Sequence, residues 1–190
     1  MHEIRRRELS DVEALKALAH PLRQRLLTRL QHRGAATSAI LAAEFGEDRG
    51  ATSYHLRQLA RYGFIEQDTA RSSGRRKYWR SVPLDLRLPR GLQAEAEVAA
   101  REVGRQWQHR AEAELAAFRA GEDAYGAFGD AAMTSLGGTT LTAEELAGFT
   151  EEYIALLSRW RRDPDEAPPE ARHITVVFHA FPTPDQEETT

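Results

Sequence analysis

Residues 37–61 read TSAILAAEFGEDRGATSYHLRQLAR, and this stretch decides the fold. Thr37 is a residue type that caps helix N-termini, and the apolar positions after it predict a short helix that Gly46 ends. After a turn at residues 47–50, a second helix is predicted over residues 51–61. Two short helices joined by a tight turn that contains glycine are typical of a helix-turn-helix.

The second predicted helix has two different faces. Its apolar face holds Thr52, Leu56 and Leu59, at the spacing of one side of a helix. The opposite face holds hydrogen-bond formers and cations: Ser53, Tyr54, Arg57 and Arg61. A helix that buries the first face therefore presents the second to a partner or to solvent.

The segments on either side extend this motif. Before it, one helix is predicted from about Ser10, which is expected to cap it, and another from Pro21. After it, residues 64–68 and 75–82 predict two strands around a polar turn, and residues 83–89 predict a connector. The hairpin is strongly cationic, with Arg71, Arg75, Arg76, Lys77 and Arg80. Helices followed by a basic hairpin predict a winged helix-turn-helix.

The net charge of −3 conceals a strong asymmetry between the two halves of the chain. Residues 1–90 carry 18 Lys and Arg against 10 Asp and Glu, a net of +8, whereas residues 91–190 carry 8 against 19, a net of −11. A basic part of this kind indicates contact with a polyanion, and the alternative is a chance segregation of solvated surface charge. Residues 5–7, all arginine, form either a mobile arm that contacts phosphates or a solvated terminus.

Four segments of the basic half follow one another in a recognisable order: ALAHPLR at 17–23, TSYHLRQL at 52–59, YGFI at 62–65 and GRRKYW at 74–79. In these segments the chain from about Leu15 to Val82 resembles the ArsR-type family of bacterial winged helix-turn-helix transcription regulators. The resemblance implies a homodimer that binds double-stranded DNA at an operator and responds to an effector.

The resemblance also implies that the second helix of the motif enters the major groove, where arginine can donate two hydrogen bonds to guanine. Base and phosphate contacts are then expected from Arg49, Ser53, Tyr54 and Arg57. On the wing, the residues expected to reach the minor groove or its phosphates are Arg71, Arg75 and Arg76, the alternative being a charged edge strand that resists aggregation. His55 matches a position usually filled by histidine in the family, where a DNA contact and a structural role are equally open.

The acidic half is predicted to be mostly helical. An apolar stripe predicts a long helix over residues 92–120, and the glycine-rich residues 121–138 predict an ordered loop with a short helix inside. A capping box at Thr142 begins an amphipathic helix. The β-branched and aromatic residues 173–181 predict a strand, and residues 183–190 predict a disordered tail.

Aromatic residues are numerous in the acidic half. They form the core and the dimer seam, or some of them line an apolar pocket for a small-molecule effector, or they form a groove for a partner protein. The residues expected to line an effector pocket are Trp107, Phe118, Tyr125, Phe128, Phe149, Tyr153 and Trp160.

Several classes of protein are excluded or disfavoured. The chain has no cysteine, which excludes disulfides, Cys-ligated zinc and thiol redox sensing and fits a cytoplasmic protein. His109 and Glu112 are two ligands where a transition-metal sensor needs about four, so neither a metal nor a cofactor is expected. No phosphate-binding glycine loop, nucleophile elbow or HExxH motif occurs, so no catalytic residue is expected. No apolar run approaches the ~20 residues of a membrane span, and no secretory signal is expected.

These observations predict a mainly α, α+β chain in two domains. Residues 1–90 are expected to form a winged helix-turn-helix DNA-binding domain with a two-stranded wing. Residues 91–190 are expected to form a mostly helical dimerisation and effector domain that ends in a β-strand. The expected function is that of a homodimeric, sequence-specific transcriptional regulator controlled by a small molecule. The alternatives are a protein-interaction module that uses the winged helix for protein contacts and a metal-responsive repressor.

Overall fold

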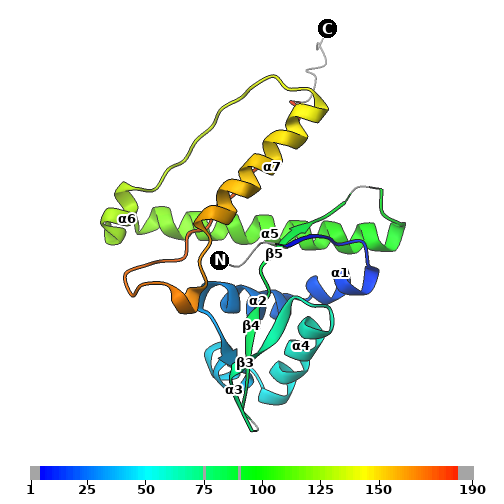
Figure 1. Ribbon diagram of the computed structural model, residues 1–190, viewed down its shortest axis with the longest axis vertical. Coiled ribbons are helices and arrows are strands. Elements are labelled where there is room, and N and C mark those ends of the chain that lie inside the picture. Colours follow the sequence, from blue (N-terminus) through cyan, green and yellow to red (C-terminus); the bar gives the residue numbers. More distant parts are fainter. Residues whose placement is uncertain (1–4, 75, 90, 184–190) are drawn as a thin grey trace. The chain divides into compact units, whose positions relative to one another are not determined.

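The computed structural model describes residues 5–74, 76–89 and 91–183, and Figure 1 shows the course of the chain. Helices make up most of the regular structure and are accompanied by a small antiparallel sheet, which confirms the predicted mainly α, α+β class. None of the described helices is both long enough and apolar enough to cross a membrane.

The chain divides into two compact units. The first unit runs through Glu112 and also takes in Arg162–His173. Of the described residues, the second unit takes in Ala113–Arg161 and residues 174–183. The long helix α5 (Ala94–Ala120) contributes to both units. The division of roles expected at residue 90 stays a prediction.

The first unit contains the predicted winged helix-turn-helix. Its four helices are α1 (Val12–Leu18), α2 (Pro21–Arg33), α3 (Ser38–Phe45) and α4 (Arg49–Arg61). Its antiparallel sheet, with the order β2-β4-β3, consists of β2 (Ala36–Thr37), β3 (Ile65–Ser73) and β4 (Arg76–Ser81). In Figure 1 the β3–β4 hairpin runs beside α3 and α4, and both helices contact it. The wing therefore has two strands as predicted, although β3 continues to Ser73 where the polar turn was predicted, and β2 adds a third strand to the sheet.

Side-chain caps set where the helices of the motif begin and end. The Thr37 hydroxyl accepts a hydrogen bond from a backbone N–H in the first turn of α3, and Gly46 closes that helix in the left-handed region at φ 66°. The Asp48 carboxylate accepts a hydrogen bond of 2.8 Å from the N–H of Ala51. Helix α4 therefore begins at Arg49, two residues before the predicted start. Asp48 is the missed signal, because an aspartate at this position satisfies an N–H of the first turn.

One cluster of buried side chains holds the first unit together. Its largest members are Leu9, Leu15, Leu18, Leu26, Leu30, Leu41, Leu56, Leu59, Phe64, Ile65 and Val103. Most of them come from the four helices of the winged helix-turn-helix, from β3 and from α5, whereas Leu9 directly follows β1 and Phe64 directly precedes β3. Full burial of one such side chain contributes roughly 1.5–3 kcal/mol.

The N-terminal segment and residues 83–89 differ from the prediction. Strand β1 (Arg5–Glu8) pairs in parallel with β5 (Leu84–Arg87). The Arg7 guanidinium lies 4.8 Å from the ring centroid of Phe64 and donates a hydrogen bond to the carbonyl of Tyr62. The expected connector is thus largely a strand, and the expected mobile arm or solvated terminus is fixed to the unit. The reason is backbone pairing between segments far apart in the chain, which local sequence patterns do not report.

Helix α1 is also displaced slightly from its prediction. Its cap is Asp11, whose carboxylate accepts a hydrogen bond of 3.0 Å from the N–H of Glu13, and not Ser10. Helix α2 begins at Pro21 as predicted, where the missing proline N–H costs no helical hydrogen bond. The sequence therefore located both helices but misassigned one cap.

The second unit consists of helices and long connections. After α5 the chain forms the 3₁₀-helix η1 (Glu122–Tyr125) and α6 (Ala127–Asp130), inside the glycine-rich segment where a short helix was predicted. Helix α7 (Ala143–Trp160) begins at the predicted capping box. There the side chains of Thr142 and Glu145 each accept a hydrogen bond from the other residue's N–H, at 3.2 and 2.7 Å.

The strand predicted at residues 173–181 is wrong. These residues form neither strand nor helix, and the described ladders pair β1 with β5, and β4 with β2 and β3. Phe178 instead stacks on Tyr153 of α7, with the ring centroids 3.9 Å apart. β-branched and aromatic composition favours a strand only where a neighbouring strand can pair with it. The predicted disordered tail lies, from residue 184 on, outside the described residues.

We expect Leu9→Ala to lower the free energy of unfolding by about 2–5 kcal/mol, because this side chain is 1% exposed and its truncation leaves a cavity. The matched control is Val98→Ala, because Val98 is 70% exposed and its truncation should cost less than about 0.5 kcal/mol. Urea unfolding followed by circular dichroism measures both variants. Equal stability of the two would contradict the packing of the N-terminal segment into the core.

Candidate nucleic-acid interface

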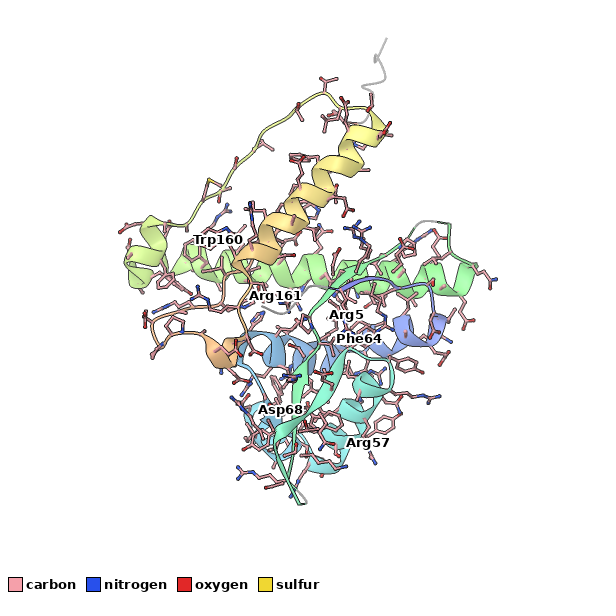
Figure 2. All side chains as sticks on the ribbon, viewed as in Figure 1. Arg5, Arg57, Phe64, Asp68, Trp160 and Arg161 are labelled. Carbon is pink, nitrogen blue, oxygen red and sulfur yellow. The ribbon has the colours of Figure 1, made fainter. Side chains whose placement is uncertain are left out.

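Helix α4 turns one face inward and the other outward. Thr52, Leu56 and Leu59 are each at most 1% exposed, and α4 packs against α2 and α3. On the opposite face Tyr54 is half exposed, and Figure 2 shows Arg57 on the outer side of the helix. The two faces predicted from the residue spacing are thus present.

The outward face of α4 brings together four of the predicted site residues: Arg49, Ser53, Tyr54 and Arg57. Arg49 and Arg57 are exposed, and the Nε of Arg57 donates a hydrogen bond of 3.3 Å to the carbonyl of Ser53. Within the described part of the chain, no carboxylate forms an ion pair with either arginine. This face therefore presents positive charge and hydrogen-bond donors to the outside.

His55, the remaining candidate on α4, packs against the cap of α2. Its ring centroid lies 4.4 Å from that of His20, whose Nδ1 accepts a hydrogen bond from the N–H of Leu22 and caps α2. Burial lowers the pKa of both histidines, and positive charge on neighbouring groups, including Arg23, lowers each pKa further. This placement favours the structural role for His55, and its contact with DNA stays a prediction.

The wing arginines differ in their surroundings. Arg76 is exposed. Arg71 lies 2.9 Å from a carboxylate oxygen of Asp165 and 3.7 Å from one of Asp68. The hydrogen bond with Asp165, followed by the charges of the nearby carboxylates, raises the pKa of Arg71 above its ordinary value. Arg75, the third predicted wing residue, lies outside the described residues.

Asp165 is a residue of this interface that sequence reasoning missed. It lies in the short 3₁₀-helix η2 (Pro164–Glu166), which belongs to the same compact unit as the wing. Its carboxylate also accepts a hydrogen bond from the N–H of Ala35, a residue 130 positions away in the chain. No local pattern around residue 165 identifies these partners, because the prolines there indicate only a break in the helix.

A groove of about 600 Å³ lies between α2 and α5 in the first unit. The charged residues of its lining include five arginines and two glutamates: Arg25, Arg29, Arg33, Arg105, Arg110, Glu44 and Glu102. The two glutamates are paired with Arg29 and Arg105, with a shortest N–O distance of 2.7 Å in each pair. Gln24 also lines the groove, is 8% exposed, and its Nε2 has no hydrogen-bond partner among the described residues. Positive charge and a buried donor without an acceptor make this groove suitable for an anion.

The aromatic residues predicted to line an effector pocket are divided between the two units. Trp107 packs against the core of the first unit. In the second unit Phe118 and Tyr125 form an edge-to-face pair with centroids 5.0 Å apart. Phe128 of α6 is 37% exposed. Trp107 thus takes part in packing of the first unit, whereas Phe118, Tyr125 and Phe128 belong to the second.

Helix α7 carries the other three predicted aromatic residues. Phe149 and Tyr153 contact Phe178 of the following segment, with centroid distances of 5.9 and 3.9 Å. Trp160 at the end of the helix is 77% exposed. An effector pocket among these side chains stays a prediction, since the observed contacts are also those of ordinary packing.

The two candidate metal ligands take other roles in the structure. His109 lines the α2–α5 groove, and Glu112 accepts a hydrogen bond of 2.9 Å from Gln108. Among the described residues, no group of three or more His, Asp or Glu is arranged to hold a metal ion.

The fold and the outward basic face of α4 define a winged helix-turn-helix protein. A family model described as a helix-turn-helix domain matches residues 18–68. The match runs from the end of α1 to the first part of β3 and confirms the predicted helix-turn-helix. None of the curated proteins matches the sequence.

The chain is similar to several solved structures. One is the homodimeric winged helix-turn-helix domain of Mb0332 from Mycobacterium bovis, a possible ArsR-family regulator, at 25% identity over 53% of this chain and 76% of that one, with a TM-score of 0.34. Another is a possible transcriptional regulator for arsenical resistance, at 29% identity over 50% and 83%, with a TM-score of 0.33. A third is MarR from E. coli, at 16% identity over 78% and 88%, with a TM-score of 0.33. The first two leave about half of this chain without a counterpart.

We expect acidification from pH 7.5 to 5.5 to destabilise the protein. The pKa values of His20 and His55 are lowered in the folded state, so the unfolded chain takes up more protons as the pH falls through the ordinary value of 6.5, and stability falls with it. His55→Gln should remove part of this dependence, whereas His109→Gln, at an exposed position of α5, should keep it. Thermal melts over a pH series measure the effect, and the same pH dependence in wild type and His55→Gln would contradict it.

Proposed function

We propose that the chain is a sequence-specific DNA-binding transcriptional regulator that acts as a homodimer in the cytoplasm. The observation that carries this proposal is the outward face of α4, where Arg49, Tyr54 and Arg57 are exposed and neither arginine has a carboxylate partner among the described residues. An α-helix fits the major groove, and an arginine on it can bind guanine through two hydrogen bonds. A face of this composition on the second helix of the motif therefore suits direct reading of bases.

The charge of the first 90 residues supports the same surface. Their net charge of +8 favours contact with DNA phosphates, because each phosphate neutralised by a cation releases condensed counterions. Arg76 on the wing is exposed and close in sequence to Lys77, which is exposed too. The wing and α4 together then provide phosphate contacts and base contacts from neighbouring elements of one unit.

The second unit supports the homodimer. None of its described side chains is buried, and its most exposed apolar residues are Met133, Leu136, Trp160 and Phe181, at 85%, 102%, 77% and 71%. Apolar surface of this kind is stabilised when a second chain covers it. A two-fold pair places two copies of α4 on one duplex, and we take a second copy of this chain to be the covering partner.

We further infer that a small organic anion bound in the α2–α5 groove controls DNA binding. An anion there gains the positive field of the lining arginines and gives Gln24 Nε2 the acceptor that the described residues do not provide. Helix α2 packs on α4, so an occupant that joins α5 to α2 acts on the support of the DNA-reading helix. The effector must bind the DNA-competent and incompetent arrangements with different affinity to have an effect.

The proposed DNA reading predicts that selection from randomised duplexes recovers a two-fold symmetric site with half-sites about one helical turn apart. Binding to that site should weaken steeply with salt, because several phosphate contacts form. Arg57→Ala should weaken binding by about 1–3 kcal/mol and relax the base preference at one position of each half-site. Fluorescence anisotropy with the selected duplex and its single-base variants measures both effects.

The matched control is Arg159→Ala, which removes the same charge from an exposed position of α7 in the second unit. This variant should keep the base preference of the wild type. Equal loss in Arg57→Ala on every duplex would contradict base reading by Arg57. Binding that is weak and blind to sequence in every variant would instead favour a winged helix that contacts another protein.

The proposed effector site predicts saturable binding of 3-phenylpropanoate, a probe with one carboxylate and an apolar body. The amide of the same acid should bind at least about 10-fold more weakly, since it lacks the charge that the arginines attract. Gln24→Leu should weaken binding of the acid by about 10-fold, because a hydrogen bond to a charged group is lost. Isothermal titration calorimetry gives the affinities, and operator binding is measured with and without the acid.

Gln93→Leu serves as the control for this experiment, because Gln93 is exposed before α5 and does not line the groove. It should bind the acid as the wild type does. Equal affinities for acid and amide, or an unchanged affinity in Gln24→Leu, would place the effector elsewhere.

A further inference from the structure

The carboxylate of Asp165 occupies a small site beside the wing. One oxygen lies 2.9 Å from Nη1 of Arg71, and the other accepts a hydrogen bond of 3.1 Å from the backbone N–H of Ala35. A guanidinium on one side and a backbone N–H on the other are the groups that proteins use to bind an oxyanion. We call Arg71, the N–H of Ala35 and the adjacent Gly34 the anion seat.

Gly34 gives this carboxylate its space. Its φ of 73° lies in the left-handed region that favours glycine, and a Cβ on this residue would lie 2.3 Å from Oδ1 of Asp165. Any other residue would push the carboxylate out of the seat. The chain at this point therefore accommodates an oxygen-bearing group directly against its backbone.

Residues 163–173, which we call the acidic strap, bring Asp165 to the seat. The Asp163 carboxylate caps η2 by accepting a hydrogen bond of 2.9 Å from the N–H of Asp165. At the other end of the strap the ring of His173 stacks on that of His32 in α2, with centroids 3.7 Å apart. The strap thus lies on the winged helix-turn-helix at two points and belongs to the same compact unit.

The strap carries the charge that a DNA backbone would present. Its acidic residues are Asp163, Asp165, Glu166 and Glu170. A carboxylate and a phosphodiester both offer two oxygens and a negative charge, so the groups of the seat can hold either one. The ion pair of Arg71 and Asp165 is partly exposed, with 44% and 24% of the two side chains accessible. Solvent therefore weakens the pair, and replacing the carboxylate by a phosphate costs little free energy.

We propose that the anion seat binds a backbone phosphate of DNA, and that Asp165 is its resident occupant when no DNA is present. The acidic strap is then an internal competitor that must leave Arg71 before the wing closes on the duplex. This inference rests on the proposed function, because it requires DNA as the ligand of the winged helix. It assigns Arg71 to contact with a phosphate that competes with a carboxylate. Arg49 and Arg57 on α4 are exposed and have no such competitor among the described residues.

Asp165→Asn tests the competition, because the variant removes the charge and keeps an oxygen that can accept from Ala35. With the duplex recovered by selection, it should bind roughly two- to five-fold more tightly than the wild type. Glu170→Gln is the matched control, since it removes the same charge from an exposed strap residue outside the seat. Its affinity should stay at the wild-type value, because the carboxylates that pair with Arg71 are those of Asp165 and Asp68, and salt screens exposed charges.

The Arg71→Ala background separates the seat from a general charge effect. There Asp165→Asn should leave the affinity unchanged, because the group for which DNA and the strap compete is gone. A gain that persists in Arg71→Ala, or an equal gain in Glu170→Gln, overturns the seat while the DNA-binding function stands. If neither the wild type nor Asp165→Asn binds any duplex, the function and the seat fail together.

Hydrogen exchange of the wild-type protein provides a measurement that needs no variant to fold. Peptides covering residues 163–173 should exchange faster when the selected duplex is added, because the strap leaves the seat. Slower or unchanged exchange of these peptides, with protection of α4 by the same duplex, overturns the proposal and leaves base reading intact.

Discussion

The burial of one face of α4 is the constraint on which the rest of the structure depends. Leu56 and Leu59 are completely buried, and a helix with 3.6 residues per turn has no freedom left once such positions are fixed inward. Tyr54 and Arg57 therefore point outward as a consequence of core packing. The Asp48 cap sets the start of the helix and so places Arg49 on its first turn. The chemistry of the candidate interface is thus determined by side chains that never touch a partner.

Much of this arrangement was predictable because the information for it is local. The caps at Thr37 and Thr142, the breaks at Pro21 and Gly46, and the two faces of α4 each depend on residues within a few positions of one another. The pairing of β1 with β5 and the contact of Asp165 with Ala35 could not be found in this way, because the partners are distant in sequence and nothing in either segment identifies the other.

Residues 173–181 show the converse error, in which a strand was predicted but does not form. Their composition suits a strand, but the structure provides no strand for them to pair with, and Phe178 packs on α7 instead.

The two halves of the sequence differ in net charge, but the structure mixes their charges locally. The basic half and the acidic half look like separate surfaces in the composition, yet an acidic residue from the second half lies on the wing and offsets one of its arginines. The arginines of α4 have no such partner among the described residues. The exposed arginines of α4 and Arg71 of the wing therefore lie in different electrostatic surroundings within the same unit. A net charge summed over 90 residues cannot show this difference, because the local charge at each arginine depends on which carboxylates lie next to it.

The contacts that helix α5 makes with the winged helix-turn-helix change in character along the helix. Val103 is fully buried in the core of the first unit, and Gln106 donates a hydrogen bond of 2.8 Å to the carbonyl of Ala19. Further along the same helix, Arg110 donates to the hydroxyl of Thr28 across the groove. The contacts of α5 with α2 thus change along the helix from close apolar packing to a polar groove in which the amide of Gln24 has no described acceptor. A ligand gains most where the protein's own contacts are least complete, so the polar end of this interface is where binding can best alter how α5 and α2 are held together.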